Sequence, residues 1–328
     1  MNATSQLKEL LFRAEKIVDN NQVPTKYRVR GYPDDDKQFN DYTNYNRDFD
    51  FISYQDVIAG GLLRCKRLFD KPLTDIDVHK MYVGRNKQWF TCELISKNSF
   101  VKIDGETHLP FLSVSYSYDK VNAIHYEIGI YRSKCTNGVL FGFKSLLKIK
   151  ATPDNIFDVD LYYNPCMLKT LVQEYERQVK LLKNTFMDRE SIRILTARAT
   201  GINSDEMNSK IYIDKIGEKE LVTTVSSLIN MYTNELGKNA YAVLNVVTDL
   251  ASHHHELNED TTEKRGMNST IKKRQAGKWL ETLVDFIEKQ NKVVPDYSID
   301  SPNFGSKPVK ERYDFSILAY LQYIKSKN

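Results

Sequence analysis

The stretch FLSVSYSYDKVNAIHYEIGIYR, residues 111–132, carries the clearest structural signal in the sequence. In its first half, apolar or aromatic residues at 112, 114, 116 and 118 alternate with serines at 113, 115 and 117. In its second half, apolar or aromatic residues at even positions from 124 to 130 alternate with His125, Glu127, Gly129 and Tyr131. A period of two is typical of β-strands, and DKVN at 119–122 is typical of a turn. The stretch therefore predicts an antiparallel hairpin whose serine face would let another backbone or a ligand approach closely.

Residues 1–30 are predicted to form an N-terminal helix, because apolar side chains recur there at helical spacing. These side chains are Leu7, Leu10, Leu11, Ala14, Ile17 and Val18. Residues 31–50 contain glycine, proline and the run Asp34, Asp35 and Asp36, which predicts an exposed acidic loop. An aspartate cluster can bind a divalent cation, but a solvated loop is the simpler interpretation, so no metal site is predicted.

The C-terminal half is predicted to be mainly helical. Asn164 and Pro165 suit a helix start, with Asn as the N-cap and Pro in the first turn, ahead of an apolar stripe that ends at Phe186. Further helices are predicted at 221–236, 239–253 and 268–290. The helix predicted at 221–236 is followed by Gly237, a natural helix terminator.

These segments predict an α+β fold. Residues 51–290 are predicted to form one core domain, with a central antiparallel sheet built partly from residues 80–134. Helices from the N-terminal and C-terminal segments are expected to pack on this sheet. Residues 291–328 contain several prolines and are predicted to form a loop and a C-terminal helix.

The composition fits a globular protein, since 41% of the 328 residues are hydrophobic and 27% are charged. The net charge of +4 is compatible with a polyanionic partner but does not require one. No apolar run approaches the roughly 20 residues that span a bilayer, so no membrane contact and a cytoplasmic location are predicted. The cysteines at 65, 92, 135 and 166 lack the short spacing of zinc ligands, and reduced thiols are expected.

Cys135 is the first candidate for catalysis, because the chain offers histidines that would serve as its base. A cysteine at a turn is more often structural, however, and Asn137 and Gly138 both tolerate positive φ. The run Cys135-Thr136-Asn137-Gly138 is therefore predicted to be a structural turn. An enzyme that uses Cys135 is kept as an alternative.

The run His253, His254 and His255 is the second candidate for catalysis. Neighbouring helical residues point about 100° apart, so three consecutive histidines cannot share one helical face. A helix end that meets solvent is the favoured interpretation, with an enzyme built on His253–His255 as the alternative. The sequence contains no P-loop and no dinucleotide-binding glycine motif, so neither a cofactor nor nucleotide hydrolysis is predicted.

Basic residues are spread over several clusters that are interleaved with aromatic residues. Lysine and arginine contact phosphates, and exposed aromatic rings stack on unpaired bases, so this pattern favours a single nucleic-acid strand. The predicted phosphate contacts are Lys144, Lys148, Lys150, Arg193, Lys272, Lys273, Arg274 and Lys278. For any one cluster, the simpler interpretation is a solvated helix face.

Two motifs together resemble a phage/plasmid-like protein family of unknown function that is carried on mobile elements. The first is SYSYD at 115–119, followed by a strand that ends in Cys135-Thr136-Asn137-Gly138. The second is NAYAVLNVVTD at 239–249, followed by His253 and His254 and later by GKW at 277–279. The family's typical Asn-Ser-His-Asp-Gly reads Ser-Tyr-Ser-Tyr-Asp-Lys here. The resemblance covers roughly residues 100–290 and implies a protein of a bacterial host's cytoplasm.

At the level of the fold, the layout is similar to that of the Erf, Red-beta and Rad-type single-strand annealing proteins. The resemblance thus implies a DNA-binding protein of recombination or replication, a homo-oligomer that anneals single strands without being an enzyme. One alternative is a phage protein that binds and inhibits a host defence complex through its acidic loop and Tyr-rich surface.

Overall fold

A computed structural model describes residues 7–21, 24–34, 38–42, 45–46, 48–119, 124–134, 137–140, 149–150, 156–157, 163–200, 216–253, 262–291 and 312–327. Within these residues the chain is α+β, as the sequence predicted. The helices are α2 Tyr54–Phe69, α3 Pro165–Lys183, α4 Arg189–Thr200, α5 Ile216–Leu236, α6 Ala240–Ser252, α7 Thr262–Asn291 and α8 Ile317–Lys327.

The strands of the described residues form three separate sheets. The main sheet has the order β10-β8-β7-β5-β4, with β6 paired to β7 and β9 paired to β8. Its strands are β4 Ile76–Val83, β5 Trp89–Ser96, β6 Val101–Ile103, β7 Glu106–Ser117, β8 His125–Arg132, β9 Asn137–Leu140 and β10 Ile149–Lys150. The others are β1 Arg13–Asp19, β2 Lys26–Asp34, β3 Gln38–Asp41, and the short parallel pair of β11 Thr185–Phe186 and β12 Tyr313–Asp314.

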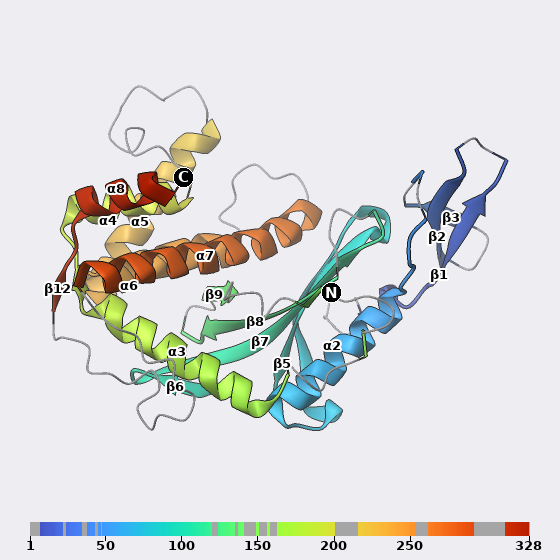
Figure 1. Ribbon diagram of the computed structural model, residues 1–328, viewed down its shortest axis with the longest axis horizontal. Coiled ribbons are helices and arrows are strands. Elements are labelled where there is room, and N and C mark those ends of the chain that lie inside the picture. Colours follow the sequence, from blue (N-terminus) through green and yellow to red (C-terminus); the bar gives the residue numbers. More distant parts are fainter. Residues whose placement is uncertain are drawn as a thin grey trace.

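The predicted hairpin is confirmed as β7 and β8, which pair antiparallel with Ser113 opposite Glu127. Its turn, residues 120–123, lies outside the described residues. Helix α2 packs against the aromatic face of β7, where the rings of Tyr54 and Tyr118 stack with their centroids 3.8 Å apart. Gly61 permits this approach, because a Cβ there would lie 2.8 Å from Val114 Cγ2. The long helix α7 covers the opposite, serine-bearing face (Figure 1).

The prediction of a helix over residues 1–30 is wrong. Residues 7–9 are helical, but the chain then enters β1, which pairs antiparallel with β2. Tyr27 and Val29 alternate with basic residues in β2, and this strand pattern offers β1 a partner. Pairing between segments outweighs the local helical spacing, since helix propensity is a weak preference. The acidic loop is also partly strand, because β2 extends to Asp34 and β3 follows, whereas Asp35 and Asp36 lie outside the described residues.

Helix α6 forms the centre of the helical layer. It is buried along nearly its whole length and contacts α5, α7, α4, α3 and β9. Its N-cap Asn239 accepts a hydrogen bond from the Ala242 amide at 3.0 Å. The predicted boundaries at Asn164, which caps α3, and at Gly237, which follows α5 with φ +88°, are confirmed. No helix in the described part of the chain is long and apolar enough to cross a membrane.

Candidate functional site

The four predicted phosphate contacts on α7 face in different directions. Lys272 and Lys278 are exposed, Arg274 is half-buried, and Lys273 is only 1% exposed. This division follows from helix geometry, because consecutive residues point about 100° apart. Only Lys272 and Lys278 of this group present their ammonium groups to solvent.

Lys273 points into the interface between α7 and the sheet. Its Nζ donates to Glu93 Oε1 at 2.5 Å and to the Tyr131 hydroxyl oxygen at 2.8 Å. Tyr131 in turn donates its hydroxyl hydrogen to Glu93 Oε2. The prediction that Lys273 contacts phosphate is therefore wrong, because its charge is used inside the protein to compensate a buried carboxylate.

Arg274 has a similar role beside it. Its Nε and one terminal nitrogen donate to the two carboxylate oxygens of Glu127 at 2.7 and 2.5 Å. Such two-point contacts are geometrically specific and strong. Glu127 thus compensates the charge of Arg274, which argues against the prediction that Arg274 contacts phosphate.

These two carboxylates belong to a polar row that crosses the main sheet. Lys80, Glu93, Ser113 and Glu127 lie directly opposite one another on β4, β5, β7 and β8. The Ser113 hydroxyl is buried and makes no hydrogen bond within the described residues. The small serine side chains of β7 were predicted to let another backbone or a ligand approach their face of the sheet. The segment that packs over this face is α7.

Electrostatics of this row depend on Lys273. Burial alone would raise the pKa of Glu93, but the charges of Lys273 and Lys80 and the hydrogen bonds from Lys273 and Tyr131 hold it below its usual value. Burial lowers the pKa of Lys80 to about 8, and the neighbouring Lys273 charge adds to this effect. Two lysines and one glutamate thus share a site in which the glutamate is ionised.

Of the remaining predicted phosphate contacts, only Arg193 has a described side chain. Arg193 lies on α4, half-buried, with a terminal nitrogen 3.4 Å from Glu190 Oε2. Lys150 belongs to β10, where its backbone pairs with His125, but its side chain is not among those described. Lys144 and Lys148 lie outside the described residues. The five predicted side chains that the structure describes, Arg193, Lys272, Lys273, Arg274 and Lys278, are therefore not gathered on one surface.

The two segments that carried the family resemblance do contact each other. Asn137 donates from Nδ2 to the Tyr232 hydroxyl oxygen at 2.7 Å, and its Oδ1 lies 3.1 Å from His253 Nε2. Because an amide oxygen only accepts hydrogen bonds, His253 Nε2 carries the proton in this pair. The Gly138 amide donates to Ser252 Oγ at 2.7 Å. The end of the hairpin is therefore fixed to the C-terminal end of α6.

The pairing of β9 with β8 corrects the predicted turn at Asn137 and Gly138, which belong to a strand. Asn137 and Gly138 form the first residues of β9, paired with Arg132 and Tyr131, and Gly138 has no positive φ. Cys135 lies outside the described residues, as do His254 and His255. Among the described thiols, Cys65 and Cys92 are buried.

A network of hydrogen bonds between buried polar groups stabilises the same contact between β9 and α6. Tyr232 donates its hydroxyl hydrogen to Asp249 Oδ2 at 2.6 Å, which extends the chain of hydrogen bonds from Asn137. Asn245 accepts from Arg132 at 3.4 Å. Asn245 and Asp249 are polar residues four apart on an apolar helix, a spacing that puts both side chains on one face. This spacing is the signal in the sequence that could have predicted the contact between β9 and α6.

Arg132 lies at the centre of the charged part of the network and is only 5% exposed. Its guanidinium contacts Glu106 at 2.6 Å and Glu235 at 2.7 Å. Lys183 also binds Glu106, and Lys134 also binds Glu235. Burial would raise the pKa of both glutamates, but these cationic partners hold the pKa of each below its usual value.

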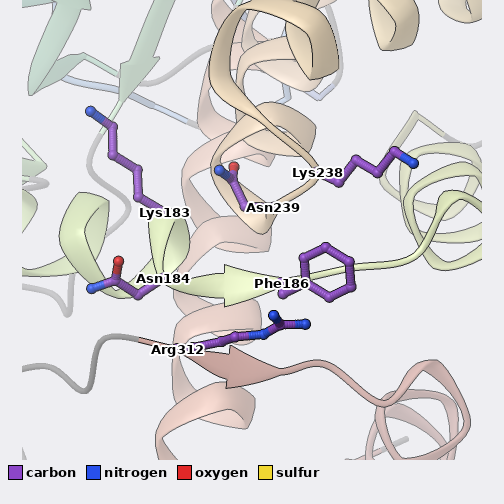
Figure 2. A pocket seen from close by; sticks show the side chains of 6 residues that line it. All are labelled: Lys183, Asn184, Phe186, Lys238, Asn239 and Arg312. Carbon is purple, nitrogen blue, oxygen red and sulfur yellow. The ribbon is translucent and has the colours of Figure 1, made fainter.

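A separate pocket of about 230 Å³ lies where three distant segments meet (Figure 2). Its lining residues are Lys183, Asn184, Phe186, Lys238, Asn239 and Arg312. Strand β12 brings Arg312 to the pocket by pairing with β11, and Tyr313 donates its amide hydrogen to the Asn184 carbonyl at 2.7 Å. None of the lining residues is acidic, and none was predicted from the sequence.

The pocket combines positive charge with an exposed aromatic ring. Phe186 is 39% exposed, and the Arg312 guanidinium lies 4.4 Å from its ring centroid. Lys238 forms no ion pair with any described residue, whereas Lys183 contacts Asp104 at 2.7 Å and Arg312 contacts Asp314 at 3.3 Å. Asn239 places the N-terminus of α6 at the pocket, which adds the partial positive charge of a helix dipole.

Comparison with known proteins found no matching family model, no matching curated protein and no matching solved structure. The resemblance to the phage/plasmid-like family therefore stays a prediction. Among the residues that the structure describes, no group of three or more potential metal ligands lies close together.

Proposed function

We propose that the protein binds single-stranded DNA and anneals complementary strands without nucleotide hydrolysis, in the recombination or replication of a mobile element. The observation that carries this proposal is the pocket formed by Lys183, Lys238, Arg312, Phe186 and the two asparagines. Single-strand binding needs cations for the phosphates and an aromatic ring for a base. The pocket offers both.

The size of the pocket suggests how a strand would lie in it. At about 230 Å³ it is smaller than the roughly 300–1,000 Å³ of sites that enclose a drug-sized molecule. In this proposal a phosphate would lie near Lys238 and Arg312, at the N-terminus of α6. The attached base would then stack on Phe186, outside the pocket.

Annealing also requires that bases remain available for pairing and that many sites act side by side. Binding through phosphates and a single stacked base meets the first requirement, because it leaves the neighbouring bases uncovered. A homo-oligomer would meet the second. Lys272 and Lys278, exposed on α7, are further candidates for phosphate contacts.

The test separates phosphate contacts from stacking by their salt dependence. Affinity for a labelled single-stranded oligonucleotide is measured by fluorescence anisotropy at several salt concentrations. The double variant Lys238→Met/Arg312→Met is expected to bind more weakly, with a slope of log K against log salt reduced by about 1.4, because each lost phosphate contact removes about 0.7. Phe186→Ala is expected to lose about 5- to 150-fold in affinity with an unchanged slope, since stacking releases no counterions.

Lys66→Met is the matched control, because Lys66 is exposed on α2, which covers the other face of the main sheet. In this variant the slope of log K against log salt should change by no more than about 0.7, the value for one peripheral phosphate contact. No binding of the unmodified protein at low salt would refute the proposal. Mixing complementary labelled strands without ATP then tests annealing, which the protein should accelerate and the double variant should not.

A further inference from the structure

Lys80 lies at a β-bulge in the edge strand β4. The register of β4 against β5 shifts between Val78 and Lys80, so that His79 is the extra residue. A bulge re-aims side chains, and here both residues of the bulge reach the same neighbour. The His79 ring lies 5.3 Å from the Tyr131 ring, and the Lys80 ammonium lies 4.9 Å from it.

The groups that face Lys80 come from every element packed around it. Glu93 lies opposite on β5, Tyr131 comes from β8, and Lys273 comes from α7. Both Glu93 oxygens are already used, one by Lys273 and one by Tyr131. Lys80 makes no hydrogen bond or ion pair with any described residue. The cluster of Lys80, Glu93, Tyr131 and Lys273 therefore holds one cation more than its carboxylate can bind.

The surplus cation changes the chemistry of the Lys80 amine. An ammonium that is half-buried, unpaired and next to a second lysine is disfavoured relative to the neutral amine. The pKa of Lys80 falls to about 8, from burial first and Lys273 second, against the opposing effect of Glu93. Burial likewise lowers the pKa of His79, and it raises that of the nearby Tyr82 hydroxyl to about 12, so both of these neighbours are uncharged at neutral pH.

We propose that Lys80 is a nucleophilic lysine that accepts an acyl group from an acyl phosphate or acyl thioester. The lone pair of Nζ attacks the carbonyl carbon, the bond from that carbon to the phosphate oxygen or thioester sulfur breaks, and phosphate or thiolate leaves with the electron pair. The nitrogen loses its proton to solvent, and a neutral amide results.

The product removes the surplus charge from the cluster. Once Lys80 is an amide, Glu93 and Lys273 form a pair of one anion and one cation with Tyr131 as a further donor. Acylation thus relieves the repulsion between Lys80 and Lys273 and leaves the contact between α7 and the sheet in place. The modification is therefore compatible with the folded state.

The test compares lysines within one folded protein and does not depend on DNA binding. The protein is incubated with acetyl phosphate over a range of pH, and acetylation of each lysine is quantified by peptide mass spectrometry. Lys80 is expected to react at least about 10-fold faster than the exposed Lys102 of β6 near pH 7.5, with a rate that levels off above about pH 8. The rate of Lys102, measured on the same samples, serves as the reference for an exposed lysine of the folded protein.

Two controls make the comparison decisive. In concentrated urea the rates of Lys80 and Lys102 should become equal, because the folded environment is lost. Lys80→Arg should abolish the signal of that peptide alone. Equal rates in the folded protein, or a Lys80 rate that keeps rising above about pH 9, would overturn the proposal.

Discussion

Replacement of Lys273 by methionine is expected to lower the free energy of unfolding by about 3–5 kcal/mol. The substitution keeps much of the side-chain volume but removes the cation that binds Glu93, whose side chain is only 5% exposed. A buried carboxylate left without its partner carries the full cost of its desolvation. Urea denaturation followed by circular dichroism measures the change.

The neighbouring residue provides the matched control. Lys272→Met changes the same residue type one position away, on the exposed side of α7, and is expected to stay within about 0.5 kcal/mol of the unmodified protein. The double variant Lys273→Met/Glu93→Gln should recover part of the loss, because no charge is then left unpaired. A Lys273→Met protein as stable as Lys272→Met would show that the buried ion pair does not form.

The pH dependence of the same variant has a defined sign. Because the pKa of Glu93 is lowered in the folded protein, its contribution to stability is present above the unfolded pKa of about 4.3 and is lost as the pH falls through the folded value. In Lys273→Met the burial of Glu93 raises its pKa, so that this carboxylate is protonated at higher pH in the variant than in the unmodified protein. The difference in stability between the two proteins should therefore be large at pH 7 and shrink steadily as the pH falls towards the lowered pKa of Glu93 in the unmodified protein.

Replacement of Arg132 by methionine is expected to cost about 3 kcal/mol, near the lower end of the range for a broken buried ion pair. Arg132 is 5% exposed and binds both Glu106 and Glu235. The loss is moderated because the two glutamates, each 25% exposed, keep Lys183 and Lys134 as partners. Thermal unfolding measured by circular dichroism at pH 7 tests this value.

Lys134→Met is the control for Arg132, since Lys134 binds the same Glu235 but is 67% exposed. An exposed pair contributes at most about 1 kcal/mol, so this variant should remain close to the unmodified protein. Equal losses for the two variants would contradict the assigned role of Arg132. The lowered pKa of Glu106 and Glu235 also predicts that the cost of Arg132→Met diminishes as the pH falls below about 4.

Local patterns predicted the elements whose formation depends on local sequence. The alternation in β7 and β8, the Asn164-Pro165 start of α3 and the Gly237 terminator are each encoded within a few residues. The segment at 13–19 was misassigned because its structure depends on pairing with β2, and helical spacing within the segment contains no information about that partner. Non-local pairing is therefore the main source of the errors.

The same limit applies to the candidate sites. A basic run on a helix does not reveal which of its members will meet a carboxylate, although Glu93 and Glu127 within buried strands were a sign that internal cations were needed. The pocket was not predictable at all, because it depends on two-residue strands, β11 and β12, that are distant in sequence.

The pairing of β11 with β12 couples the pocket to the segment that ends in α8. Arg312 is held at the pocket by this segment, which is anchored where Lys327 binds Asp285 at 2.9 Å and where Phe286 packs on Tyr320. Docking of this segment would strengthen the binding of a ligand that contacts Arg312. The ligand would then stabilise the docked segment by the same free energy. Because of this reciprocity, a substitution of Asp285 on α7 would change the affinity of the pocket for its ligand, although Asp285 does not line the pocket.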